Sequence, residues 1–315
     1  HFFAREVKGH GVPEVMVAVA AKGGRIRSRV AVAKTLASSI CIGSGGSVGR
    51  EGPIVQIGSS LGSTIGQWLK LPKDWINTLI ACGAAGGIAS TFNAPMGGVF
   101  FAHEVILRRV ITPSFIPVVI SSVLATIVSR AFLGDNPSFL IPGYEMASGW
   151  EILFYILLGV IAAFVAVAFV RSLYKCEDLF DVWRLPGYLK PVFGGLLVGL
   201  IACFYSPDLF GVGYGGPEYN GMMMYGIAGY GAINKALLGE IGLGILLGML
   251  ALKIVATSVT LGSGGSGGVF APSLFMGAMF GGAFGIGVGK LFPAMTASSG
   301  AYALVGMAAG FAAAA

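Results

Sequence analysis

Two distant segments of this chain are copies of each other, and each contains a glycine-rich break inside an apolar stretch. Residues 43–66 read GSGGSVGREGPIVQIGSSLGSTIG, and residues 262–285 read GSGGSGGVFAPSLFMGAMFGGAFG. Residue 262 lies 219 positions after residue 43, and this offset aligns the GSGGS motifs, a proline and four further glycines without a gap. Corresponding glycine- and proline-interrupted segments in two halves of a membrane protein indicate a substrate site.

Both breaks predict the start of a helix that can bind an anion. Glycines in the breaks permit positive φ angles, and Pro53 and Pro272 suit the first turn of a helix, where no N–H is required. A helix start presents N–H groups and the positive end of the helix dipole, so it can bind an anion without a cationic side chain. Glycine can also serve close helix packing, which is the role we expect for Gly58, Gly62, Gly66 and their copies.

The composition indicates an integral membrane protein with several membrane passes. Hydrophobic residues make up 55% of the chain and charged residues 11%, whereas about a quarter of the residues in ordinary soluble domains are charged. Four apolar stretches approach the roughly 20 residues that cross a bilayer: residues 110–129, 152–170, 191–206 and 269–289. Residues 15–21 form a shorter apolar segment, as expected of the broken helices inside a transporter.

Charged and metal-binding residues give little sign of other functions. The net charge is +6, and we expect the basic residues to lie mostly in loops and at helix ends, as interfacial anchors rather than a nucleic-acid site. The four cysteines and three histidines have no metal-binding spacing, so neither a metal nor another cofactor is expected. An intramembrane serine hydrolase using Ser44 or Ser263 would need a base, and no nucleophile motif places one, so an enzyme is not expected.

The chain is expected to contain two half-repeats, residues 1–135 and residues 136–315. It begins with His1 and ends in GFAAAA, inside an apolar helical run. We therefore expect both ends to be cut, with the second half incomplete at its C-terminal end.

Four motifs resemble those of the CLC family of chloride channels and proton-coupled chloride transporters. They are GHGVP at residues 9–13, GREGP at 49–53, FNAP at 92–95 and GVFAP at 268–272. The resemblance implies an all-α integral membrane fold, an inverted repeat of tilted and broken helices, in the plasma (inner) membrane. It further implies a homodimer surrounded by lipid, with chloride or another small anion as the bound ligand in each subunit.

The resemblance also implies which residues form the anion path. The central site would use the backbone N–H groups of Val269 and Phe270, with Gly268 shaping the turn. An outer site would use the backbone around Arg50, Glu51 and Gly52. His10 stands where the family usually has a serine beside the inner end of the path, and it could line the path or be structural. Gly11 is retained in the same loop.

Glu51 is the candidate gate. An acid at membrane depth is costly and is a functional candidate by default, and burial beside an anion favours its neutral form. The ionised carboxylate can occupy the anion site, whereas the protonated side chain can leave it. The resemblance implies the same role as external gate and proton acceptor, although Glu51 could instead be an acid satisfied at a helix start.

One departure from the family bears on proton coupling. Proton-coupled members usually carry an inner glutamate at the position of Val105, which favours passive, channel-like chloride conduction in this chain. A proton/chloride antiporter remains the alternative, with a possible proton route through Glu104 or His103. Successive helical residues differ by about 100°, so Glu104 does not simply replace an acid at position 105, and both side chains could instead form a polar interface cluster.

Overall fold

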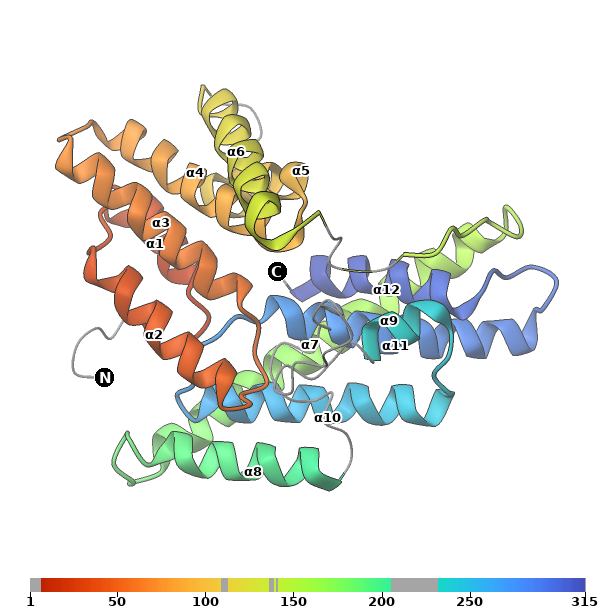
Figure 1. Ribbon diagram of the computed structural model, residues 1–315. Helices are drawn as coiled ribbons and strands as arrows, with labels where there is room; N and C mark the ends of the chain where they lie inside the picture. Colours follow the sequence, from red (N-terminus) through yellow and green to blue (C-terminus); the bar gives the residue numbers. More distant parts are fainter. Residues whose placement is uncertain (1–6, 109–112, 136–138, 140, 205–231, 315) are drawn as a thin grey trace. The chain divides into compact units, whose positions relative to one another are not determined.

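The computed structural model describes residues 7–108, 113–135, 139, 141–204 and 232–314, and these residues form helices and loops (Figure 1). One isolated parallel β-bridge joins Gly9 and Ser266. The elements of the first part of the chain are α1 (Val12–Ala21), α2 (Arg29–Gly43), α3 (Glu51–Trp68), α4 (Lys73–Phe92), α5 (Pro95–Phe101), the π-helix η2 (Ala102–Leu107) and α6 (Phe115–Leu133). Those of the second part are α7 (Glu151–Val182), α8 (Lys190–Phe204), α9 (Ala232–Leu238), α10 (Leu243–Gly262), α11 (Phe270–Leu291) and α12 (Ser299–Ala314).

Five helices in the described residues are long and apolar enough to cross a membrane: α4, α6, α7, α10 and α11. Three of the four predicted spanning stretches fall largely within α6, α7 and α11. Residues 191–204 of the fourth stretch lie in α8, which has 15 residues and is a shorter apolar helix. Residues 110–112 of the first stretch and residues 205–206 of the fourth lie outside the described residues. The predicted short segment lies in α1, which has 10 residues. The prediction of a helical integral membrane fold with long and short helices is therefore confirmed.

The residues of the chain pack into two compact units, and each contains part of the other half's glycine-rich break. The first unit consists of residues 1–41, 50–138 and 266–268, and the second of residues 42–49, 139–265 and 269–315. The predicted inversion of one half-repeat relative to the other stays a prediction.

Glycines bring α3 and α4 together in the first unit, where the two helices lie side by side (Figure 1). A Cβ atom on Gly58 would collide with the carbonyl oxygen of Gly83, and one on Gly62 with that of Leu79. The copies behave alike in the second unit, where α11 packs on α12. There Gly277 faces the carbonyl of Gly306, and Gly281 faces that of Tyr302. The predicted packing role of this glycine series is confirmed.

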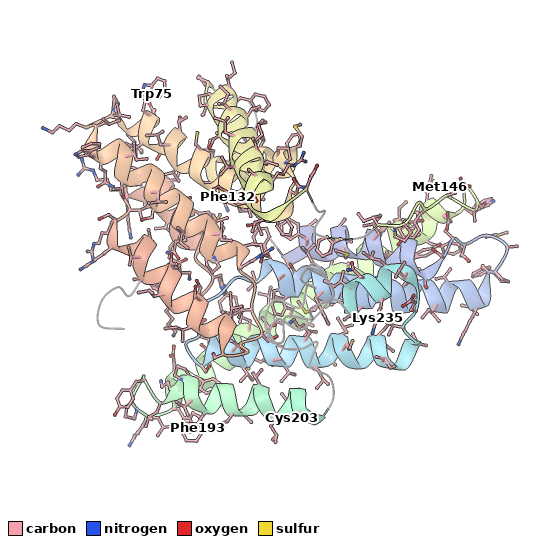
Figure 2. The ribbon with its side chains drawn as sticks, viewed as in Figure 1. Trp75, Phe132, Met146, Phe193, Cys203 and Lys235 are labelled. Carbon is pink, nitrogen blue, oxygen red and sulfur yellow. The ribbon has the colours of Figure 1, made fainter. Side chains whose placement is uncertain are left out.

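Burial separates the helices that face the interior from those that face outward. Within the most apolar 18-residue window, 61% of the residues of α11 are buried, against 17% for α6 and 22% for α7. The exposed surfaces of α6 and α7 are rich in large apolar side chains, including Phe132. Trp75 and Phe132, labelled in Figure 2, are among the exposed aromatic side chains. Apolar surface of this extent is expected to be covered by lipid or by another protein surface.

Candidate functional site

The first glycine-rich break ends at the start of α3. Arg50 is the N-cap residue, Glu51 is the first residue of the helix, and Pro53 lies in the first turn. The first hydrogen bond of the helix runs from the Ile54 N–H to the Arg50 carbonyl at 3.0 Å. Arg50 supplies no side-chain cap, so the helix start presents its backbone N–H groups and dipole in the way that suits an anion.

The second break ends at the start of α11 in the same register. Val269 is the N-cap residue without a side-chain cap, Phe270 is the first helical residue, and Pro272 lies in the first turn. The Ser273 N–H donates to the Val269 carbonyl at 2.9 Å. Every one of these positions lies 219 residues after its counterpart in α3, so the prediction of two matching helix starts is confirmed. Binding of an anion by Val269 and Phe270 stays a prediction.

The loop before α1 depends on two glycines with positive φ angles. Gly9 has φ 82° and Gly11 has φ 87°, a conformation that side-chain-bearing residues rarely adopt. His10 lies between them and is half-buried. Gly11 is the N-cap of α1, and Pro13 follows in the first turn, so the short helix begins directly after His10.

Three of the motifs converge on Gly52 within the first unit. A Cβ atom on Gly52 would collide with the carbonyl oxygen of His10 and would lie 2.9 Å from the Cα atom of Gly268. A Cβ atom on Gly11 would lie 3.1 Å from the Gly52 carbonyl oxygen and 2.7 Å from the Gln56 side chain. The structure thus brings together the predicted residues His10, Gly11, Gly52 and Gly268. Val269 and Phe270 follow Gly268 in the chain and belong to the second unit.

Glu51 is fully buried beside this convergence point. Its Oε1 atom lies 3.9 Å from Nε of Arg50, whose side chain is half-exposed. Arg50 also donates through Nη2 to the Thr91 carbonyl at 3.5 Å, at the end of α4. The positive end of the helix dipole stabilises a carboxylate at the first position of a helix, whereas burial destabilises the charged form. The role of Glu51 as a gate stays a prediction.

The candidate proton-route residues lie on a π-helix rather than on a regular α-helix. The π-helix η2 includes both His103 and Glu104, and its i→i+5 spacing replaces the 100° per residue assumed from sequence. His103 is buried, and its ring centroid lies 5.4 Å from that of Phe115. The Glu104 side chain is exposed, and Val105 is half-buried. The two candidates therefore have different surroundings, and their role in proton movement stays a prediction.

Sequence reasoning missed two lysines, because it expected the basic residues mostly in loops and at helix ends. In the described part of the chain, Lys34 and Lys253 are fully buried within α2 and α10. Lys253 lies 219 positions after Lys34 and therefore belongs to the same duplication, but this shared position does not by itself predict burial.

In this helical membrane chain, two matching helix starts, a buried acid at one of them and glycine loops around it form the arrangement that is expected of an anion site. The sequence profile described as "Voltage gated chloride channel" matches residues 1–315. The chain therefore belongs to this family, the CLC family of chloride channels and transporters.

Similar proteins include both channels and exchangers by name. A protein of Ralstonia nicotianae that is named as a ClcB-like chloride channel protein is 33% identical over 95% of this chain and 67% of its own length. The H(+)/Cl(-) exchange transporter ClcA of Vibrio cholerae is 33% identical over 99% of this chain and 65% of its own length. This chain thus spans about two thirds of the length of these two relatives.

A solved structure shares the fold. The crystal structure of a slow cyanobacterial Cl⁻/H⁺ antiporter matches with a TM-score of 0.81 and 26% identity, over 97% of this chain and 69% of that one. A CLC-type fluoride/proton antiporter matches with a TM-score of 0.73 and 22% identity, over 96% of this chain and 71% of that one, which supports the fold alone.

Proposed function

We propose that this chain moves chloride across the membrane by proton-coupled exchange, with Glu51 as the gate and proton acceptor. The observation that carries the proposal is the burial of Glu51 at the first position of α3, beside the point where three motifs meet at Gly52. Chloride and other small anions are the proposed ligands, held by backbone N–H groups at the starts of α3 and α11. No cofactor and no nucleic acid takes part in this proposal.

The proposed cycle uses one acid in two states. The ionised Glu51 carboxylate competes with an anion for the N–H groups and dipole of the helix start. Protonation removes that competition, so the neutral side chain can leave and an anion can enter. Exchange requires that Glu51 takes up its proton from one side of the membrane and releases it to the other, so that each cycle of the gate carries a proton in the direction opposite to the anion and couples the two gradients.

The relatives support exchange better than the passive conduction expected from Val105. ClcA of Vibrio cholerae is named as an H(+)/Cl(-) exchange transporter, and the cyanobacterial neighbour is described as a Cl⁻/H⁺ antiporter. The second candidate, passive conduction, keeps one observation in its favour, since position 105 carries valine in the π-helix η2. In the exchange proposal, His103 and Glu104 are the candidates for an inner proton route.

The proposed surroundings follow from the apolar exterior. Large apolar side chains cover α6 and α7, and we propose lipid and a second copy of the chain as the surfaces that cover them. The plasma (inner) membrane is the proposed location.

Simultaneous flux recording tests the proposed function. The purified protein is reconstituted into liposomes with an outward chloride gradient, and chloride efflux and proton uptake are recorded together. Proton movement in a fixed ratio to chloride supports exchange. Chloride movement without protons would establish the passive candidate in its place, and an absence of anion flux would contradict both.

A further inference from the structure

Lys34 is a buried cation in the middle of α2. Its side chain is fully buried, and Nζ donates hydrogen bonds to the carbonyl oxygens of Val7 at 3.0 Å and Gly9 at 2.8 Å. Burying an ammonium is costly unless the group is paired and hydrogen-bonded. The Glu14 carboxylate, in the first turn of α1, lies close enough to interact electrostatically with Lys34. The lysine therefore binds one specific stretch of backbone at a defined place.

The same two carbonyls also accept hydrogen bonds from the second glycine-rich break. Ser266 Oγ donates to the Val7 carbonyl at 2.9 Å, and the Gly267 N–H donates to the Gly9 carbonyl at 3.4 Å. The parallel bridge between Gly9 and Ser266 runs along this contact. Residues 7–9 thus accept hydrogen bonds both from the lysine and from the second break.

The residues that follow these contacts are those that meet at Gly52. His10 comes directly after Gly9, and Gly268 comes directly after Gly267. The His10 carbonyl and the Gly268 Cα atom are the two nearest neighbours of a Cβ atom placed on Gly52. A shift of residues 7–9 would therefore move two of the three motifs around the start of α3.

We propose that Lys34 is a positioning residue for the anion path: its ammonium holds residues 7–9 so that the motifs of His10 and Gly268 stay in register at Gly52. This inference rests on the proposed function, because the register matters for transport only if the anion passes here. Lys34 acts through backbone carbonyls and does not itself bind the anion.

The second copy of the repeat also contains a buried lysine, which indicates that the burial of Lys34 belongs to the repeated structure and is not accidental. Lys253 occupies the equivalent position in α10, is also fully buried, and its Nζ lies 5.0 Å from the ring centroid of Phe275. Ser47, the copy of Ser266, donates its N–H to Thr260 Oγ1 of α10 at 3.2 Å. Each compact unit thus contains a buried lysine and a break whose serine is hydrogen-bonded to protein groups.

A double-mutant cycle distinguishes positioning from a long-range effect of the lysine's charge. Lys34→Met and Ser266→Ala each remove a donor from the same Val7 carbonyl, but only Lys34→Met changes the charge. Residues in one hydrogen-bond network give coupled effects, whereas independent effects add. Lys73→Met, an exposed lysine at the start of α4, is the matched control.

Chloride affinity of the purified chain is measured by isothermal titration calorimetry, with unfolding temperature as a check on folding. We expect each single variant to weaken chloride binding about tenfold, and the double variant to bind about as weakly as Lys34→Met alone. Lys73→Met should bind like the wild type. Additive losses, or unchanged binding in folded Lys34→Met, would overturn the positioning role.

A third variant covers the case in which Lys34→Met does not fold. Lys34→Gln is neutral but keeps two N–H donors, so positioning predicts affinity within about threefold of the wild type. A loss of tenfold or more in folded Lys34→Gln, with no coupling to Ser266→Ala, would refute the positioning role. If the wild type itself binds no chloride, the proposed function fails first, which is a separate and recognisable result.

Discussion

Gly52→Ala tests whether the meeting of the three motifs controls anion binding. The added Cβ atom would collide with the His10 carbonyl oxygen and would lie 2.9 Å from the Gly268 Cα atom. An ordinary contact begins at about 3.4 Å, so Gly52 and Gly268 must separate by at least about half an ångström. All the nearest obstacles are backbone atoms, so a side-chain rotation cannot relieve the clash.

The size of the effect follows from the hydrogen bonds that such a shift weakens. A hydrogen bond to a charged group contributes about 1.5–3 kcal/mol, and every 1.4 kcal/mol corresponds to about tenfold in affinity. If the shift costs the anion one backbone N–H, chloride affinity should fall about 10- to 100-fold. Overpacking should also lower the free energy of unfolding by about 1–3 kcal/mol.

The assay is calorimetric chloride titration of the purified variant, alongside its chloride flux in liposomes. Gly159→Ala in α7 is the control, because a Cβ atom there meets nothing within 4 Å and alanine favours helix. We expect the control to bind and conduct like the wild type. Wild-type affinity and flux in a folded Gly52→Ala protein would refute the reasoning, since the crowded backbone would then not govern the path.

Three further predictions concern the gate Glu51, the histidine His10 that stands in place of the family's usual serine, and the packing glycines. Glu51→Gln should behave as the protonated gate, with chloride flux that persists, loses most of its pH dependence and no longer drives protons; strict pH gating in this variant would count against the role. His10→Ser should change anion selectivity and the pH response of flux if the imidazole lines the path, and unchanged behaviour in both would make His10 structural. Gly277→Ala should place a Cβ atom against the Gly306 carbonyl on α12, which should lower the free energy of unfolding by about 1–3 kcal/mol and thereby the unfolding temperature. Gly287→Ala on the same helix is the control, because its Cβ meets nothing within 4 Å, and equal unfolding temperatures for the two variants would contradict the packing argument.

The duplicated breaks were the most predictive part of the sequence. Their glycines and prolines have strong backbone preferences, so the sequence placed Pro53 and Pro272 in the first turns of two helices, and these are the first turns of α3 and α11. The packing of Gly58 and Gly277 followed from the same spacing, because small residues at every fourth position form one face of a helix.

Features that depend on tertiary contacts were not predictable. The apolar pattern around His103 does not distinguish a π-helix from an α-helix, since both bury a similar set of residues over so short a segment. The burial of Lys34 depends on carbonyls 27 and 25 residues earlier in the chain, which no local pattern indicates. The burial of Glu151 also depends on distant segments, because this fully buried acid accepts hydrogen bonds from the Ala297 N–H and the Tyr302 hydroxyl.

The central claim is that backbone N–H groups at the two matching helix starts hold the transported anion, with Glu51 competing for one of them. Crystals of the wild type and of Glu51→Gln grown in bromide would locate the ion by its anomalous scattering. We expect a bromide peak within hydrogen-bonding reach of the Val269 and Phe270 nitrogens in both crystals. A second peak at the start of α3 should appear only in Glu51→Gln. Bromide found only beside surface lysines and arginines, with neither helix start occupied, would contradict the claim.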